Sequence, residues 1–369
     1  MKMRRLFCCP IAQPSHNHLV NLGRALLLTL GCVGAVSAQS PGQWVRVDSP
    51  TEVSLRGVST VNENVVWAGG AEGTLLRSTD GGQSFTRLHI PHSEEMEFRD
   101  LEAFDDQTCS VMVAGQPARF YHTSDGGKNW KMAYEHPSDK AFFDAMAFWD
   151  NQRGIAFSDA VDGRLVIVST ENGGRTWTLH PPEESPRISA DEHGYAASGT
   201  CLTVGENGEV WIGLGGPSAT ENSRVFYSTD FGKHWKDGTS TLRGSESAGV
   251  FSLHFLDSRR GIAVGGDYRE TTSAKSVLSL TDDGGKTWYT PEDHLLRGFR
   301  SCIVEYPDGD NRLLICCGPD GCDVSKDGGK HWKALAGDGF HAMDFEGSAG
   351  WAVGADGRIA RWKGSNAVR

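Results

Sequence analysis

The sequence predicts an all-β fold, a seven-bladed β-propeller of four-stranded antiparallel blades in which the N-terminal strand closes the last blade. Two repeats predict this fold: a polar eight-residue phrase that occurs six times, and a short apolar strand pattern that occurs seven times. Successive phrases lie 44 to 58 residues apart, which is the length of one four-stranded blade. The mismatch between six phrases and seven strands predicts how the ring closes.

The first 38 residues are predicted to be a cleaved signal peptide. Basic residues precede an apolar run over residues 25–35, and the small residues at 36–38 offer a cleavage site before Gln39. The run is too short to span a bilayer. We therefore expect an exported protein, periplasmic or secreted, that does not span a membrane. A lipoprotein anchored through Cys32 is the less favoured alternative, because Thr29 stands where an aliphatic residue is usual.

Net charge and cysteine content limit the function classes for residues 39–369, which we predict to be a single domain. The leader carries four basic residues and no acidic ones, so its removal changes the formal net charge from −11 to −15. This charge argues against a nucleic-acid partner, which would require a basic face.

Six cysteines remain after the leader is removed, which is too few for a disulfide scaffold. They are Cys109, Cys201, Cys302, Cys316, Cys317 and Cys322. Either a bridge from Cys316 or Cys317 to Cys322 or buried free thiols would fit the sequence. Because the chain has no Cys-x-x-Cys pair and no cofactor motif, we predict neither a metal nor a cofactor.

The polar phrase suits a hairpin turn between two strands. It contains a hydroxyl residue, an acidic residue two positions later, glycine, and then an aromatic residue that begins the next strand. The hydroxyl and the carboxylate can hold the loop backbone by hydrogen bonds, while the glycine adopts a positive φ. The acidic position is occupied by Asp80, Asp125, Asn172, Asp230, Asp283 and Asp327.

Seven apolar segments, which begin at residues 66, 111, 154, 210, 261, 314 and 350, are typical of short buried strands. The last unit lacks a polar phrase, whereas residues 43–47 have no unit of their own. Pairing these two ends completes a seventh blade and leaves no open sheet edge. A six-bladed ring with a C-terminal cap is the alternative. We expect blades at about residues 54–90, 98–135, 142–180, 196–237, 249–290, 299–335 and 340–363.

The repeated Ser-x-Asp-x-Gly-x-x-Trp phrase resembles the Asp-box, or bacterial neuraminidase repeat, over nearly the whole chain after the leader. Within that group, residues 55–59, 66–82 and 350–359 are similar to the photosystem II stability and assembly factor-like propellers. The resemblance implies a non-catalytic propeller that binds a protein or peptide partner, without by itself implying photosynthesis. The Asp-box alone is a poor marker of function, since it also occurs in glycosidases and sorting receptors.

Candidate binding residues come from the predicted inner strands, which line the channel of a propeller and open at its mouths. Aligning these strands, with the fourth placed at residues 197–199, brings Arg56, Arg99, Arg300 and His341 into one column. Guanidinium groups on separate blades can converge on a carboxylate or phosphate. We predict that this column binds an anionic group. The alternative is a structural ring in which Asp100, Glu102 and Asp144 neutralise the arginines.

The sequence thus predicts an exported, non-catalytic, monomeric propeller that binds a protein or peptide partner. The alternative function is a secreted glycoside hydrolase, sialidase-like or otherwise exo-acting, with Asp100 or Asp144 as a catalytic carboxylate. Against it, the chain lacks the Arg-Ile-Pro phrase of sialidases and the Thr-Asp-Val-Gly-Gly phrase of propeller xyloglucanases.

Overall fold

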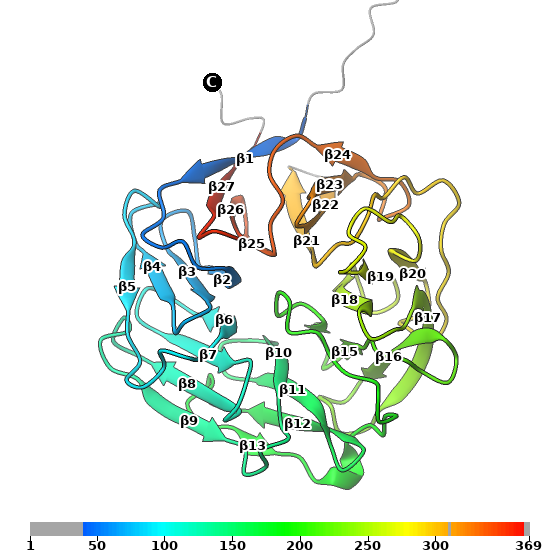
Figure 1. Cartoon of the computed structure of the whole chain (residues 1–369), viewed down its shortest axis with the longest axis horizontal. Coiled ribbons are helices and arrows are strands. Elements are labelled where there is room, and N and C mark those ends of the chain that lie inside the picture. Colours follow the sequence, from blue (N-terminus) through cyan, green and yellow to red (C-terminus); the bar gives the residue numbers. More distant parts are fainter. Residues whose placement is uncertain (1–39, 309–310, 365–369) are drawn as a thin grey trace, which may run out of the picture. The chain divides into compact units, whose positions relative to one another are not determined.

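The strands form seven antiparallel sheets around a common centre, in a computed structural model that describes residues 40–308 and 311–364 (Figure 1). The predicted signal peptide and Cys32 lie outside the described residues. Among those residues, the only helical segment is the short 3-10 turn η1 (Pro182–Glu184), and no helix is long and apolar enough to cross a membrane. The predicted seven-bladed all-β fold is confirmed.

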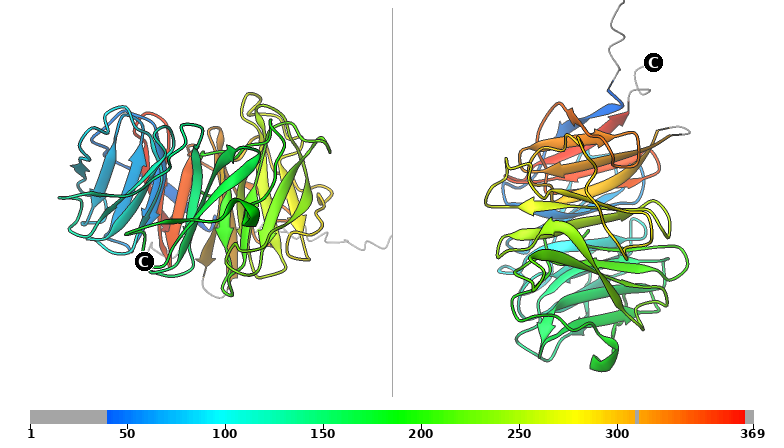
Figure 2. Two further views of the ribbon diagram at one scale, coloured as in Figure 1. Left: turned by 90° about the horizontal axis from the view of Figure 1, so that it is seen from below. Right: turned by 90° about the vertical axis from the view of Figure 1, so that its right-hand side faces the viewer.

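Each blade is a meander whose first strand lies nearest the centre, and edge-on views show the blades standing side by side (Figures 1 and 2). Blade one consists of β2 (Leu55–Thr60), β3 (Val66–Gly70), β4 (Leu75–Ser78) and β5 (Thr86–Leu88). Blade two consists of β6 (Phe98–Ala103), β7 (Cys109–Val113), β8 (Arg119–Thr123) and β9 (Lys131–Glu135). Blade three consists of β10 (Phe143–Phe148), β11 (Gly154–Val161), β12 (Arg164–Thr170) and β13 (Thr178–Leu179).

Blades four to seven complete the ring. Blade four consists of β14 (Leu202–Val204), β15 (Val210–Gly213), β16 (Asn222–Ser228) and β17 (Lys236–Arg243), and blade five of β18 (Ala248–Phe255), β19 (Gly261–Asp267) and β20 (Leu278–Thr281). Blade six consists of β21 (Cys302–Asp308), β22 (Asn311–Gly318), β23 (Gly321–Ser325) and β24 (Lys333–Leu335). Blade seven consists of β25 (Ala342–Glu346), β26 (Ala349–Val353) and β27 (Ile359–Gly364) with β1 (Gly42–Val47). In blade five a single bridge between Leu280 and Tyr289 takes the place of a fourth strand.

The seventh blade closes as the sequence predicted. β1 pairs with β27 along its whole length, with Trp44 opposite Trp362. The rings of these two residues lie 5.0 Å apart, and Trp44 also contacts Phe340 at 5.7 Å and Phe345 at 5.6 Å. Strand pairing and aromatic packing therefore join the two ends of the propeller.

The six polar phrases form equivalent turns, as the turn at Asp80 illustrates. Ser78 Oγ donates to Asp80 Oδ1 at 2.8 Å, and the Ser84 amide donates to the same oxygen at 3.0 Å. Gly82 has a φ of 82°, and a Cβ there would collide with the ring of Trp351 in blade seven. Each such turn thus shapes its own hairpin, and at this position also packs against the preceding blade.

The six cysteines are buried free thiols, which is the second of the two alternatives drawn from the sequence. Cys317 lies opposite Cys302 on one neighbouring strand and opposite Cys322 on the other.

Candidate functional site

The candidate site is a cavity of about 500 Å³ at the end of the channel where the inner strands begin. We call it the arginine mouth; its lining includes Arg56, Arg99 and His341 on one side and Tyr195 and Phe251 on the other. These residues come from blades one, two, five and seven and from the segment before β14. The mouth therefore combines a polar side with an apolar side.

A larger cavity, of about 720 Å³, lies at the opposite end of the inner strands. Within it, Glu305 contacts His254 at 3.3 Å and Arg312 at 3.3 Å, and the other charged residues of the lining are acidic: Glu206, Glu209, Asp257 and Asp344. Because these acidic groups would repel an anion, we consider the smaller arginine mouth the better candidate for an anionic ligand. Among the described residues, no group of three or more His, Cys, Asp or Glu side chains is placed to hold a metal ion.

Arg56 is the most informative residue of the mouth. It lies at an irregularity in β2 between Leu55 and Gly57, which turns its side chain away from the regular ladder. Its half-buried guanidinium makes no ion pair or side-chain hydrogen bond with any residue in the described ranges. Burial, and then the charge of Arg99, lower the pKa of Arg56. The nearby Glu97 acts in the opposite direction, but it is ion-paired with Arg99. The Arg56 guanidinium has thus lost part of its hydration without an ion pair of its own, which a bound anion would supply.

Arg99 occupies the equivalent irregularity in β6, between Phe98 and Asp100. Its Nε donates to Glu97 Oε2 at 2.5 Å, and its Nη1 donates to the carbonyl of Ala196 at 3.2 Å. Arg99 therefore joins blade two to the segment that precedes β14.

His341 lines the mouth as an uncharged group. Its Nδ1 lies 3.2 Å from the carbonyl oxygen of Leu55. Burial, and then the charge of Arg56, lower the pKa of His341 to about 4. The imidazole is therefore neutral near pH 7 and adds no positive charge to the arginine pair.

Arg300 does not join the other arginines, which corrects the column drawn from the sequence. Its side chain is 3% exposed and is ion-paired with the fully buried Asp323; its Nε donates to Asp323 Oδ2 at 3.0 Å. Whereas Arg56 and Arg99 lie within their inner strands, Arg300 precedes β21 and turns into blade six. We therefore remove Arg300 from the proposed ligand set.

Of the two aspartates of the hydrolase alternative, Asp144 lines the arginine mouth with only 1% of its surface exposed, and Asp100 lies outside that lining. Burial raises the pKa of Asp100 to about 8, and burial together with Asp159 raises the pKa of Asp144 well above its usual value. Gly194 and Gly199 lie directly against these carboxyl groups, so that a Cβ at either position would collide with them. No described arginine forms an ion pair with Asp100 or Asp144, in contrast to the structural ring considered above.

A loop over residues 186–201, which we call the strap, is a part of the site that the sequence did not predict. Residues 197–199, predicted as an inner strand, belong to this loop, and the inner strand β14 begins only at Leu202. The strap lies over the mouth and carries Tyr195 into it. The available signal was the interval of 58 residues between the third and fourth polar phrases, the longest in the chain.

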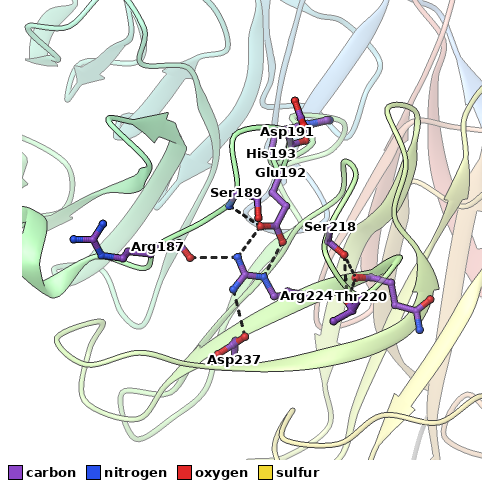
Figure 3. Close-up of polar contacts among 10 residues, drawn as sticks. Arg187, Ser189, Asp191, Glu192, His193, Ser218, Thr220, Arg224 and Asp237 are labelled. Carbon is purple, nitrogen blue, oxygen red and sulfur yellow. Dashed lines mark hydrogen bonds and ion pairs between the residues drawn. The ribbon is translucent and has the colours of Figure 1, made fainter.

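A buried ion pair anchors the strap to blade four (Figure 3). Arg224 of β16 donates from Nε and Nη2 to the two carboxylate oxygens of Glu192, each at 2.7 Å, and the Glu192 side chain is 1% exposed. The Ser189 amide donates to the same carboxylate at 2.8 Å. Burial alone would raise the pKa of Glu192, but these hydrogen bonds outweigh it and hold that pKa below its usual value.

Tyr195 completes a group of aromatic side chains that we call the aromatic wall: Tyr195, Phe251, Tyr268 and Phe299. The Tyr195 ring is stacked on Phe251 with centroids 3.8 Å apart, and Phe299 meets Phe251 edge-on at 4.6 Å. The Tyr195 hydroxyl lies 3.3 Å from the carbonyls of Ser245 and Ala248 in blade five. Two contacts thus fix the strap: the ion pair between Glu192 and Arg224, and the stacking of Tyr195 on Phe251.

Comparisons with known proteins agree with the fold. Residues 36–178 match the family described as "Photosynthesis system II assembly factor YCF48". The chain is 22% identical over 361 residues to the photosystem II assembly lipoprotein Ycf48 of Synechococcus sp. (strain CC9902), covering 95% of this chain and 98% of that protein. A sialidase of Bacteroides fragilis (strain YCH46) is 23% identical over 225 residues, 58% of this chain and 36% of the sialidase.

Among solved structures, a YCF48 bound to a D1 peptide superposes with a TM-score of 0.62 at 17% identity. The alignment covers 88% of this chain and 97% of that one. The match to the Synechococcus protein covers nearly the whole of both chains, whereas the sialidase match is partial. The chain is therefore a β-propeller that is similar to the Ycf48 proteins.

Proposed function

We propose that this protein is an exported, non-catalytic, monomeric propeller that binds a protein or peptide partner, in the manner of an assembly or stability factor. The partner presents an anionic group to Arg56 and Arg99 in the arginine mouth. The observation that carries this proposal is the half-buried guanidinium of Arg56, which has no ion-pair partner among residues 40–308 and 311–364 and lines a cavity of about 500 Å³. A cavity of this size accepts a few side chains of an extended segment.

Similarity to known proteins also supports the proposal. Those similar over most of the chain are named as assembly proteins, and one superposable YCF48 was solved with a peptide bound. Several relatives are also named lipoproteins, which supports export and keeps a lipid-modified Cys32 as the alternative to cleavage before Gln39.

Differential capture tests the binding proposal. Wild-type protein, Arg56→Ala and Arg99→Ala are used as baits on the envelope fraction of the source cells, and each co-eluting protein is then titrated by calorimetry. Each substitution should weaken binding of the true partner by about 1–3 kcal/mol, the value of a charge-assisted hydrogen bond. Arg260→Ala, which removes an exposed arginine outside the mouth, is the matched control.

Equal affinity of wild type, Arg56→Ala and Arg99→Ala for every captured protein would exclude the mouth as the binding site. Hydrolysis is tested in parallel with Asp100→Asn and Asp144→Asn in a glycoside screen. Turnover by the wild-type protein that disappears in these folded variants would contradict a non-catalytic role.

A further inference from the structure

The arginine mouth has an apolar half that the anionic group of a partner does not use. Phe251 and Phe299 form its base, at 3% and 5% exposure, while Tyr268 stands at the rim with 43% of its surface exposed. Because the Tyr195 hydroxyl already faces backbone carbonyls, Tyr195 contributes mainly ring surface to the cavity.

Two sets of contacts hold this apolar half at a fixed distance from the arginines. The ion pair between Glu192 and Arg224 anchors one part of the strap (Figure 3). The hydrogen bond from Arg99 Nη1 to the Ala196 carbonyl ties the next part to blade two. Tyr195 lies between these two anchors, so the aromatic wall and the guanidinium pair form one rigid, two-part surface.

The aromatic wall could in principle accept either an apolar ring or a cation. Asp159 and Glu246 line the mouth together with Arg56 and Arg99, so its charges are mixed. Glu246 is already paired with Arg269 at 3.1 Å, and Arg269 lies over the ring of Tyr268, 5.7 Å from its centroid, so the position for a cation on this wall is already occupied. An aromatic ring, in contrast, gains contacts with the partly exposed rings of Tyr195 and Tyr268 and removes apolar surface from water.

Resting on the proposed function, we propose that the mouth selects a peptide segment in which an aromatic side chain neighbours a carboxylate. The carboxylate binds Arg56 and Arg99, and the aromatic ring packs against the aromatic wall. Glu192 and Arg224 are positioning residues, since they act on the ligand only through the placement of Tyr195.

Three end-blocked hexapeptides test this selection by fluorescence anisotropy. They are identical except at two central positions, which carry phenylalanine–aspartate, alanine–aspartate or phenylalanine–asparagine. We expect the first to bind about tenfold more tightly than the second, the scale of burying one aromatic ring in an apolar site. The third should also bind more weakly than the first, because it lacks the charge.

A pair of tyrosine variants assigns the preference to the wall. Tyr268→Ala removes a rim residue that is not part of the buried core, and it should reduce the preference for phenylalanine over alanine by threefold or more. Tyr289→Ala is the matched control, because Tyr289 is similarly exposed, at 39%, but lies outside the mouth. It should leave the preference unchanged.

Glu192→Gln tests the strap. It should reduce the preference for phenylalanine while the preference for aspartate over asparagine persists, a pattern that a general loss of fold would not produce. Thermal melting identifies any variant that fails to fold, and in that case Tyr268→Ala decides.

The outcomes separate this inference from the proposed function. If the alanine–aspartate peptide binds as tightly as the phenylalanine–aspartate peptide, and Arg56→Ala weakens both, the proposed function stands and the aromatic selection is wrong. If aspartate and asparagine peptides bind equally, the anionic site is wrong. Binding of none of the three peptides contradicts both.

Discussion

At the residue scale, Arg56 and Arg300 show how equivalent sequence positions can diverge. Both follow an apolar residue, but Arg56 lies within the inner strand β2, whereas Arg300 lies two residues before the inner strand β21. Arg56 stays in the channel without an ion-pair partner among the described residues, whereas Arg300 is buried against Asp323. One arginine is thus available to a ligand, and the other holds blade six together.

This difference predicts opposite effects on stability. Arg300→Ala leaves the buried carboxylate of Asp323 with no closer charged partner than the exposed Arg297 at 3.9 Å, so the free energy of unfolding should fall by about 3–5 kcal/mol. Arg56→Ala removes a charge that has no counter-ion, so the same quantity should change by less than about 1 kcal/mol. Urea unfolding measures both. Equal losses in the two variants would show that Arg56 is also a structural residue.

At the element scale, two segments outside the repeat determine the architecture of the ring and of its mouth. β1 supplies the outer strand of blade seven and contributes Trp44 to a cluster with Trp362 and Phe340. The strap replaces the beginning of an inner strand in blade four and brings Tyr195 to the mouth. Both segments depend on contacts with residues distant in sequence.

Removal of β1 should destabilise the ring. A protein that starts at Ser49 loses the strand pairing to β27 and the burial of Trp44, together about 2–4 kcal/mol, so its melting temperature should fall by several degrees. Trp44→Ala should produce part of this loss. Gln43→Ala is the control, because Gln43 is exposed in the same strand. An unchanged melting temperature in the truncated protein would mean that β1 does not stabilise the closure.

At the scale of the whole molecule, acidic side chains from different blades converge on the channel. Burial raises the pKa of Asp100 and Glu102, both on β6, to about 8. Burial likewise raises the pKa of Asp344, on β25, to about 6. Their mutual repulsion adds to the effect for Glu102. The folded protein therefore holds protons that the unfolded chain releases near pH 4.

The pH dependence follows from this proton uptake. Between about pH 6.5 and pH 8 these carboxyl groups make the folded state bind more protons than the unfolded state, so stability should decrease as pH rises through this range. Below about pH 6.5, His122 and His341, whose pKa is lowered to about 4, act in the opposite direction. Glu102→Gln removes one of these carboxyl groups, and its melting temperature should fall less between about pH 6.5 and pH 8 than that of the wild type. Glu63→Gln, an exposed control, should follow the wild type. Parallel curves for Glu102→Gln and the wild type would contradict a raised pKa of Glu102 in the folded protein.

The sequence by itself determined the ring. Blade number, hairpin turns and closure by residues 43–47 follow from repeated local patterns, because a turn such as that at Asp80 is stabilised by its own hydroxyl, carboxylate and glycine. Of the predicted ligand column, the structure places Arg56, Arg99 and His341 together, although their binding role remains a proposal.

Only the tertiary structure decided which charged side chains of the predicted site are ion-paired within the protein. The sequence could not show that Asp323 neutralises Arg300, nor that Arg224 holds Glu192 and with it the strap. Burial and ion pairing depend on side chains that different strands bring together, whereas the repeat records only the spacing within each blade. The fold could therefore be predicted from local sequence patterns, whereas the chemistry of the site depends on contacts between distant residues.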